Sequence, residues 1–132
     1  MPTNTINPVK LDEPLTRYIF QKSHCGGGRV KHGAFMPNSK NGEVSIYRIE
    51  GWESANIWDE GKEIGGKSGK SLKGRGDFQW EKLEGAAVVG IYPDPHPSRH
   101  ANIKDFPEPR EKAQEQATIL AEACQFVRFS PQ

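Results

Sequence analysis

Alternation of apolar and polar positions predicts several short β-strands in the first two thirds of the chain. The clearest case is residues 43–49 (EVSIYRI), where Val44 and Ile46 alternate with polar neighbours. This period of two is typical of a strand with one buried face. Flanking Gly, Pro and Asn residues punctuate the other apolar runs as turns would. Those runs predict further strands at 17–22 (RYIFQK), 30–36 (VKHGAFM) and 86–92 (AAVVGIY).

A helical period appears near the C-terminus. Pro107 and Pro109 are well placed at a helix start, because proline needs no amide hydrogen bond there. Ser54 is an N-cap residue for a short helix that ends at Gly61, and Asp77 could cap one more helical turn. The face of the C-terminal helix is defined by apolar residues at intervals of four and three, namely Ala113, Ala117, Leu120, Cys124 and Val127.

Together these elements predict one α+β domain. We expect a mostly antiparallel sheet of about four strands, covered on one face by the C-terminal amphipathic helix. The length of 132 residues suits a single domain. Residues 1–14 are polar and contain three prolines, which predicts a flexible N-terminal arm ahead of a domain at 15–132. Segment 61–76 (GKEIGGKSGKSLKGRG) predicts a basic, glycine-rich loop.

Charge and hydropathy limit the cellular compartment and the kinds of partner that we expect for this protein. The 18 Lys and Arg residues nearly balance 17 Asp and Glu residues, so no overall field draws the chain to nucleic acid or to a membrane. No apolar run approaches the roughly 20 residues of a membrane span, and the first residues do not resemble a signal peptide. Cys25 and Cys124 do not form a disulfide framework. We expect a cytoplasmic protein with two free thiols and no membrane contact.

Residues 61–68 (GKEIGGKS) match the spacing of a phosphate-binding P-loop. A true P-loop follows a buried strand and opens a helix, whose amides hold the phosphates. Here IWDE precedes the segment and a glycine-rich stretch follows it, so we interpret it as a solvated loop. An alternative stays open, in which this segment clamps a phosphate or an RNA backbone through Lys67, Lys70, Lys73 and Arg75.

The four histidines form two pairs in irregular segments, His24 with His32 and His96 with His100. Imidazoles can serve as acid and base near neutral pH, and a nearby cation can stabilise developing charge. Surface histidines without a role are also common. The candidate catalytic residues are His24, His32 and His100, and the candidate ligand-binding residues are Lys31, Arg48, Lys67, Arg75, His96 and Asn102. For Arg48, a solvent-facing strand position is the favoured alternative.

A zinc site would have to use Cys25 and the histidines. No C-x-x-C pair is present, and the histidine spacing does not fit a structural zinc site, so we predict neither a metal nor a cofactor. Trp52, Trp58 and Trp80 are interpreted as core anchors, because a small domain needs large apolar side chains.

Three strings resemble a group of short bacterial proteins of unknown activity. They are VKHGAFMP at 30–37, EVSIYR at 43–48 with Ile57 and Trp58 downstream, and HPSRHANI at 96–103 ahead of an alanine-rich helix. The resemblance spans about residues 17–124. It implies a bacterial origin and no mechanism.

Two hypotheses for the function of this protein remain. The first is a non-enzymatic binding or regulatory module that contacts a protein partner. The second is a protein that interacts with a nucleotide or RNA, such as a metal-independent phosphodiesterase or ribonuclease that uses the loop histidines. The second requires the two histidine pairs to converge. The partner is therefore a protein or a phosphate-bearing ligand, and the oligomeric state stays open.

Overall fold

The computed structural model describes residues 7–83, 87–95 and 98–130. Its main feature is a six-stranded sheet in the order β6-β7-β4-β1-β5-β8, in which every pair of neighbours is antiparallel. The strands of this sheet are β1 (Leu15–Ile19), β4 (Val44–Arg48), β5 (Gly74–Phe78), β6 (Gly90–Pro93), β7 (His100–Lys104) and β8 (Gln125–Arg128). The α+β class and the antiparallel sheet are confirmed, whereas the expected number of about four strands is wrong.

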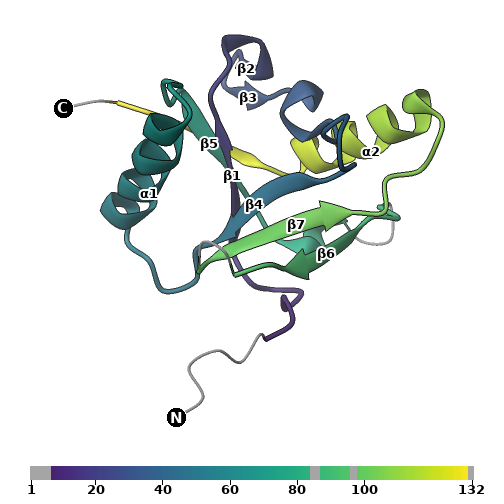
Figure 1. Ribbon diagram of the computed structural model, residues 1–132, viewed down its shortest axis with the longest axis horizontal. Coiled ribbons are helices and arrows are strands. Elements are labelled where there is room, and N and C mark those ends of the chain that lie inside the picture. The colour runs from purple at the N-terminus through teal and green to yellow at the C-terminus, as the bar shows by residue number, and fades with distance from the viewer. Residues whose placement is uncertain (1–6, 84–86, 96–97, 131–132) are drawn as a thin grey trace.

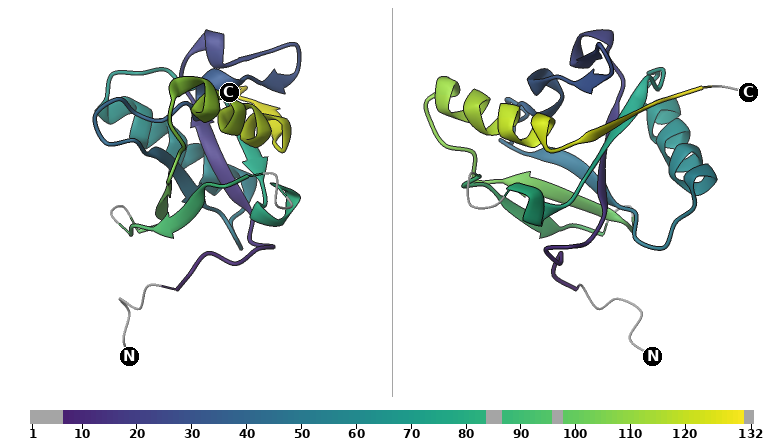
Figure 2. Two further views of the ribbon diagram at one scale, coloured as in Figure 1. Left: turned by 90° about the vertical axis from the view of Figure 1, so that its right-hand side faces the viewer. Right: turned by 180° about the vertical axis from the view of Figure 1, so that it is seen from behind.

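The remaining elements flank this sheet. A small hairpin pairs β2 (Cys25–Gly26) with β3 (Arg29–Val30). The helices are α1 (Ser54–Lys67) and α2 (Arg110–Glu122), and the 3₁₀ turns are η1 (Lys22–His24), η2 (His32–Phe35) and η3 (Trp80–Leu83). Figures 1 and 2 show α1 and α2 on opposite sides of the sheet.

Each face of the sheet has its own core, as the alternation in β4 requires. Val44 and Ile46 point to the larger core, which includes Leu120 of α2. Tyr47 points the other way, into a smaller core that includes Ile57 of α1. The prediction of a C-terminal helix packed on one face is therefore confirmed, and a second helix covers part of the other face.

Three strands were not expected, because their sequences hide the strand period. β5 (GRGDF) carries two glycines where core side chains would stand, and Asp77 lies in this strand rather than at a helix start. β7 falls in the segment expected to be a loop, yet four of its five residues are buried. β8 was expected to extend the C-terminal helix, but α2 ends at Glu122. Conversely, the expected strand at 30–36 is mostly the turn η2.

The prediction of a loop at 61–76 is also wrong. α1 continues through Gly61 to Lys67, so the connection to β5 is only residues 68–73. Both glycines face the sheet: a Cβ at Gly61 would lie 2.7 Å from Cε1 of Tyr18, and one at Gly65 would lie 2.7 Å from Cε1 of Phe20. The glycines that suggested a flexible segment instead allow close packing of helix on sheet. Residues 61–68, which we interpreted as a solvated loop and not as a P-loop, are instead the last turns of α1 and its C-cap.

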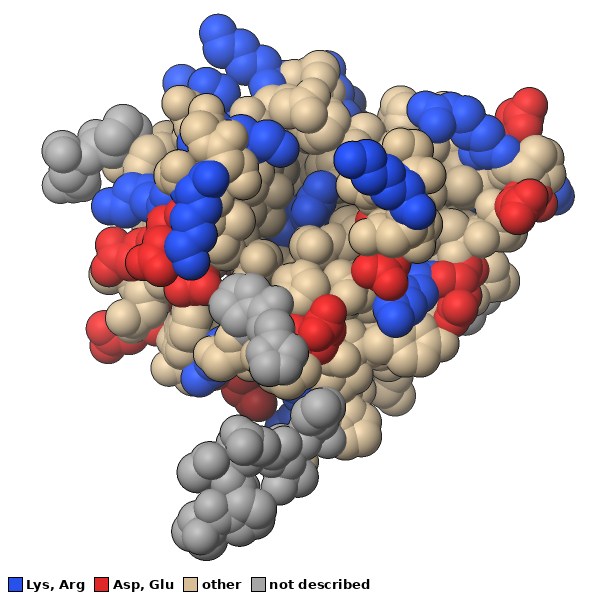
Figure 3. All heavy atoms as spheres, viewed as in Figure 1, with Lys and Arg blue, Asp and Glu red and all other residues tan. Residues whose placement is uncertain are grey.

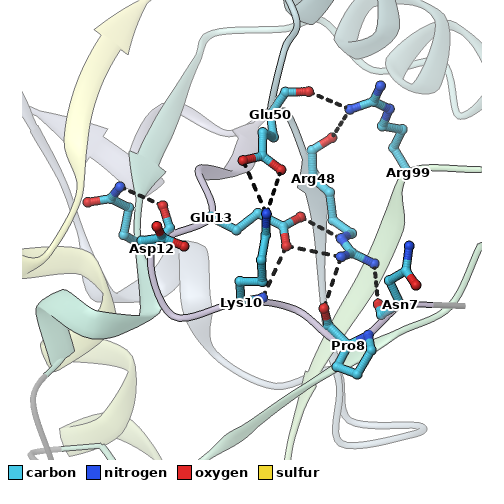
Figure 4. A network of polar contacts seen from close by, with 9 residues as sticks. Asn7, Pro8, Lys10, Asp12, Glu13, Arg48, Glu50 and Arg99 are labelled. Carbon is cyan, nitrogen blue, oxygen red and sulfur yellow. Dashed lines mark hydrogen bonds and ion pairs between the residues drawn. The ribbon is translucent and has the colours of Figure 1, made fainter.

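The described part of the N-terminal arm is anchored rather than flexible. Val9 is buried, and Glu13 is 2% exposed. Arg48 of β4 donates hydrogen bonds to both carboxylate oxygens of Glu13 and to the carbonyls of Asn7 and Pro8 (Figure 4). The first six residues of the predicted arm lie outside the described residues.

Two further features can be compared with the sequence analysis, namely membrane-spanning helices and the state of the cysteines. No helix in the described ranges is both long and apolar enough to cross a membrane. Cys25 and Cys124 are free thiols, as expected, and both are half-buried.

Glycine packing in α1 can be tested with three alanine variants. Gly61→Ala and Gly65→Ala each place a methyl group against an aromatic ring, and we expect each to lower the free energy of unfolding by about 1–3 kcal/mol. At Gly66 a Cβ would meet nothing within 4 Å. Gly66→Ala should therefore raise stability by up to about 1 kcal/mol through helix propensity. Urea denaturation measures all three, and stabilisation by Gly61→Ala would contradict the packing.

The Glu13–Arg48 pair predicts a pH dependence of stability. Burial alone would raise the pKa of Glu13, but hydrogen bonds and positive charges from Arg48 and Lys10 outweigh it and hold this pKa below 4.5. The folded protein then binds fewer protons than the unfolded chain, so this stabilisation is present above about pH 4.5 and is lost as the pH falls through the folded pKa. We expect Glu13→Gln to lower stability by about 3 kcal/mol at pH 7.

Chemical denaturation of wild type and Glu13→Gln between pH 3 and pH 7 checks this expectation. The difference in unfolding free energy should shrink below about pH 4.5. Glu50→Gln is the matched control, since the Lys10–Glu50 pair is more than half exposed on both sides and should contribute less than about 1 kcal/mol. A constant difference across this range would contradict the assignment.

Candidate functional site

A hollow in the surface lies between α1, the 68–73 connection and the end of β8. One pocket of about 500 Å³ is lined by Lys62, Gly66, Lys70, Ser71, Leu72, Lys73, Arg128 and Phe129. A second of about 670 Å³ is lined by Ala55, Trp58, Asp59, Lys62, Arg128, Phe129 and Ser130. The two share Lys62, Arg128 and Phe129, so they form one continuous groove, here named the α1–β8 groove.

In the lining of the α1–β8 groove, positively charged side chains outnumber negatively charged ones. Among the described residues, no carboxylate lies within 4 Å of the side-chain nitrogens of Lys70, Lys73 or Arg128. Lys62 is 3.5 Å from Asp59, in a pair whose side chains are both more than half exposed. An exposed pair of this kind is weak and yields readily to a stronger anion. The groove therefore offers four cations to a ligand.

Backbone hydrogen bonds hold the ends of this groove in place. The amide of Lys73 donates to the carbonyl of Ile19 at 2.8 Å, and the carbonyl of Lys73 accepts from the amide of Phe129 at 3.0 Å. These bonds extend the ladder from β1 through β5 to the chain after β8. Lys73 and Phe129 are thus positioned by the sheet rather than by a free loop.

Two aromatic rings line the same groove. The centroids of Trp58 and Phe129 lie 5.1 Å apart, with the rings tilted by 57°. Beneath Trp58 the guanidinium of Arg75 is 4.4 Å from the ring centroid. Trp58 is half-buried: it packs against the smaller core, as the core-anchor interpretation expected, and it also lines the groove. The indole is therefore fixed from below and open toward the groove.

Arg75, expected to bind a ligand, is instead 7% exposed and belongs to the floor. Its Nε donates to both carboxylate oxygens of Asp77, at 3.1 and 3.2 Å. Asp77 also accepts a hydrogen bond of 2.7 Å from Thr16 on the neighbouring strand. The Nη1 atom of Arg75 is buried without a hydrogen-bond partner among the described residues. Its role in this arrangement is to support Trp58.

The first histidine pair lies beside the β2–β3 hairpin. A Cβ at Gly33 would be 2.9 Å from Cδ2 of His24, so this imidazole packs against the η2 backbone. Burial, with the positive charges of Arg17 and His32, lowers the pKa of His24. His32 and Lys31 line a separate pocket of about 500 Å³ against α2, together with Arg29, Glu122 and Cys124.

His100 lies elsewhere. It pairs with Tyr47 in the sheet and is 9% exposed, on the face that α1 partly covers. Its Nδ1 is 3.0 Å from the carbonyl of Asp94, and Asn102 donates a 3.1 Å hydrogen bond to the Asp94 carboxylate. β1 and β4 run antiparallel, so His100, opposite the end of β4, is at the far end of the sheet from η1 and η2.

The structure therefore places His24 near His32 but keeps His100 apart from both, and His96 lies outside the described residues. Arg48 is committed to Glu13, and Lys67 is 3.7 Å from Glu63 on the exposed surface of α1. Within the described ranges, no group of three or more His, Cys, Asp and Glu residues is placed to hold a metal ion.

Sequence reasoning found part of the α1–β8 groove and missed part of it. Lys70 and Lys73 were named only in the alternative interpretation of segment 61–76 as a phosphate clamp, from the density of basic residues there. Trp58 was assigned to the core, against which it does pack, while Arg128 and Phe129 were missed because β8 was expected to be helical. The available signal for these two was the short apolar run FVRF at 126–129, which also suits a strand.

Charge is unevenly distributed over the surface. In Figure 3, Lys and Arg are spread over the upper part of the face shown, while Asp and Glu gather at the left, among the Lys side chains there, and at the right. The charge of this face is therefore mixed, and the positive charge of the groove is local.

Comparisons with models of protein families, with curated protein sequences and with solved structures find no match for this chain. The resemblance of its strings to short bacterial proteins thus stays a prediction, and any function must be argued from the groove.

Proposed function

We propose that this protein is a non-enzymatic binding module that holds a phosphate-bearing polyanion in the α1–β8 groove. The observation that carries the proposal is the set of cations Lys70, Lys73 and Arg128, which have no carboxylate within 4 Å among the described residues and line the groove that Trp58 and Phe129 also line. Phosphate oxygens are suitable partners for such a cluster, because each contact releases a condensed counterion from the polyanion.

Binding is favoured over catalysis by the contents of the groove. Its described lining contains no histidine and no cysteine, and its one carboxylate, Asp59, is already paired with Lys62. Acid–base cleavage of a phosphodiester needs two groups within hydrogen-bond reach of one bond. The position of His100, at the end of the sheet away from η1 and η2, does not support the convergence of histidines that the ribonuclease hypothesis required.

A protein partner is the competing occupant of the groove. Lysine is depleted at the centres of protein–protein interfaces, where aromatic residues and arginine predominate. A groove with three lysines suits an extended anion better than a folded protein surface. Binding of an acidic protein segment in the groove, in place of a phosphate-bearing polyanion, would therefore contradict the proposal.

Removal of two groove lysines should weaken polyanion binding and its salt dependence. For the Lys70→Ala/Lys73→Ala double variant, we expect weaker binding of a dye-labelled 12-nucleotide RNA, measured by fluorescence anisotropy. With about 0.7 per phosphate contact for single strands, the slope of log K against log salt should fall by about 1.4.

The matched control is Lys40→Ala/Lys112→Ala, which removes the same charge from exposed positions outside the groove. It should leave the slope nearly unchanged. Equal weakening by the two double variants would mean that only net charge matters, and no detectable binding by wild type at low salt would overturn the proposal.

A further inference from the structure

We infer that the occupant of the α1–β8 groove is a single-stranded nucleic acid, with one base stacked on the ring pair of Trp58 and Phe129. This inference rests on the proposed function, because it names the ligand class for the same groove. Charge alone would accept any polyanion, whereas stacking also requires a flat ring on the ligand.

The three tryptophans of the chain differ in what surrounds them. Trp52 lies under Arg99, whose guanidinium is 4.7 Å from the ring centroid, and Trp80 packs against the larger core. Trp58 lines the 670 Å³ part of the groove, with Phe129 beside it and Lys62 on the same wall. An aromatic pair among cations is the arrangement that binds unpaired bases through their faces and the backbone through its charge.

The ring of Trp58 is prepared for stacking by the residues beneath it. The guanidinium of Arg75 supports one face at 4.4 Å, and Asp77 and Thr16 fix that guanidinium in turn. A side chain held in one orientation loses little conformational entropy when a ligand stacks on it. The buried Arg75 thereby contributes to recognition without touching the ligand.

Stacking distinguishes a single strand from other phosphate polymers. In a duplex the base faces are already stacked on their neighbours, and inorganic polyphosphate has no ring at all. Both can use Lys70, Lys73 and Arg128, but neither can use Trp58. The loss of one stacking partner costs a single strand about tenfold in affinity.

The experiment compares four probes on the full chain: 12-nucleotide oligo(A) RNA, the same sequence as DNA, the RNA in a duplex, and inorganic polyphosphate of similar length. Anisotropy competition gives the affinities, and tryptophan fluorescence reports stacking. We expect both single strands to bind about tenfold more tightly than the duplex or the polyphosphate, with quenching that is lost in Trp58→Leu. A difference in affinity between the single-stranded RNA and the single-stranded DNA would identify which of the two nucleic acids is the preferred ligand.

Trp58→Leu should weaken single-strand binding about tenfold and leave polyphosphate binding unchanged, so the polyphosphate affinity also reports that the groove is intact. Trp52→Leu is the matched control. If Trp58→Leu does not fold, Phe129→Leu is measured in the same way. Equal binding of all four probes without quenching overturns the stacking inference and leaves the proposed function standing. Failure of every probe to bind overturns both.

Discussion

The contact of two glycines with two aromatic rings positions α1, and the α1–β8 groove depends on it. Gly61 and Gly65 bring the helix so close to Tyr18 and Phe20 that no side chain fits between. The hydroxyl of Tyr18 also donates to the carbonyl of Ile57 at 2.6 Å, which ties the helix backbone to the sheet. A helix held at this distance places its basic and aromatic side chains beside the edge strand β8.

The opposite wall of the groove depends on the sheet itself. Among the described residues β8 pairs only with β5, so it is an edge strand, and the chain just beyond it remains in register through the Phe129–Lys73 hydrogen bond. The Arg75–Asp77 pair, in which the side chain of Arg75 is 8% exposed and that of Asp77 26% exposed, lies in β5 and joins the two walls, because Arg75 supports Trp58 of α1. An ion pair of this kind is weak evidence for stability, so we assign it the role of holding the ring.

The sequence was informative where periodicity was strong and uninformative where packing replaced it. β4 and most of α2 followed from alternation and helical spacing, because their buried residues are mostly apolar and recur at the period of a strand or of a helix. β5 did not, since Gly74 and Gly76 leave space for Phe126 and Val30 of other segments. A local sequence pattern contains no information about which residues, distant in the sequence, will pack against a strand.

The same limit applies to the candidate site. The density of basic residues identified Lys70 and Lys73, but the glycines around them indicated flexibility rather than close packing. The histidines attracted attention by residue type, which contains no information about distance. His24 and His100 belong to different ends of the sheet, and only the strand order reveals this.

The central claim, that the α1–β8 groove is the binding site, is tested most directly by amide chemical-shift mapping during titration with a 12-nucleotide RNA. The account predicts that the largest shifts fall in residues 58–73 and 128–130. Shifts centred on the β2–β3 hairpin and His32, or on His100 and Asn102, would contradict it and assign binding to another part of the surface.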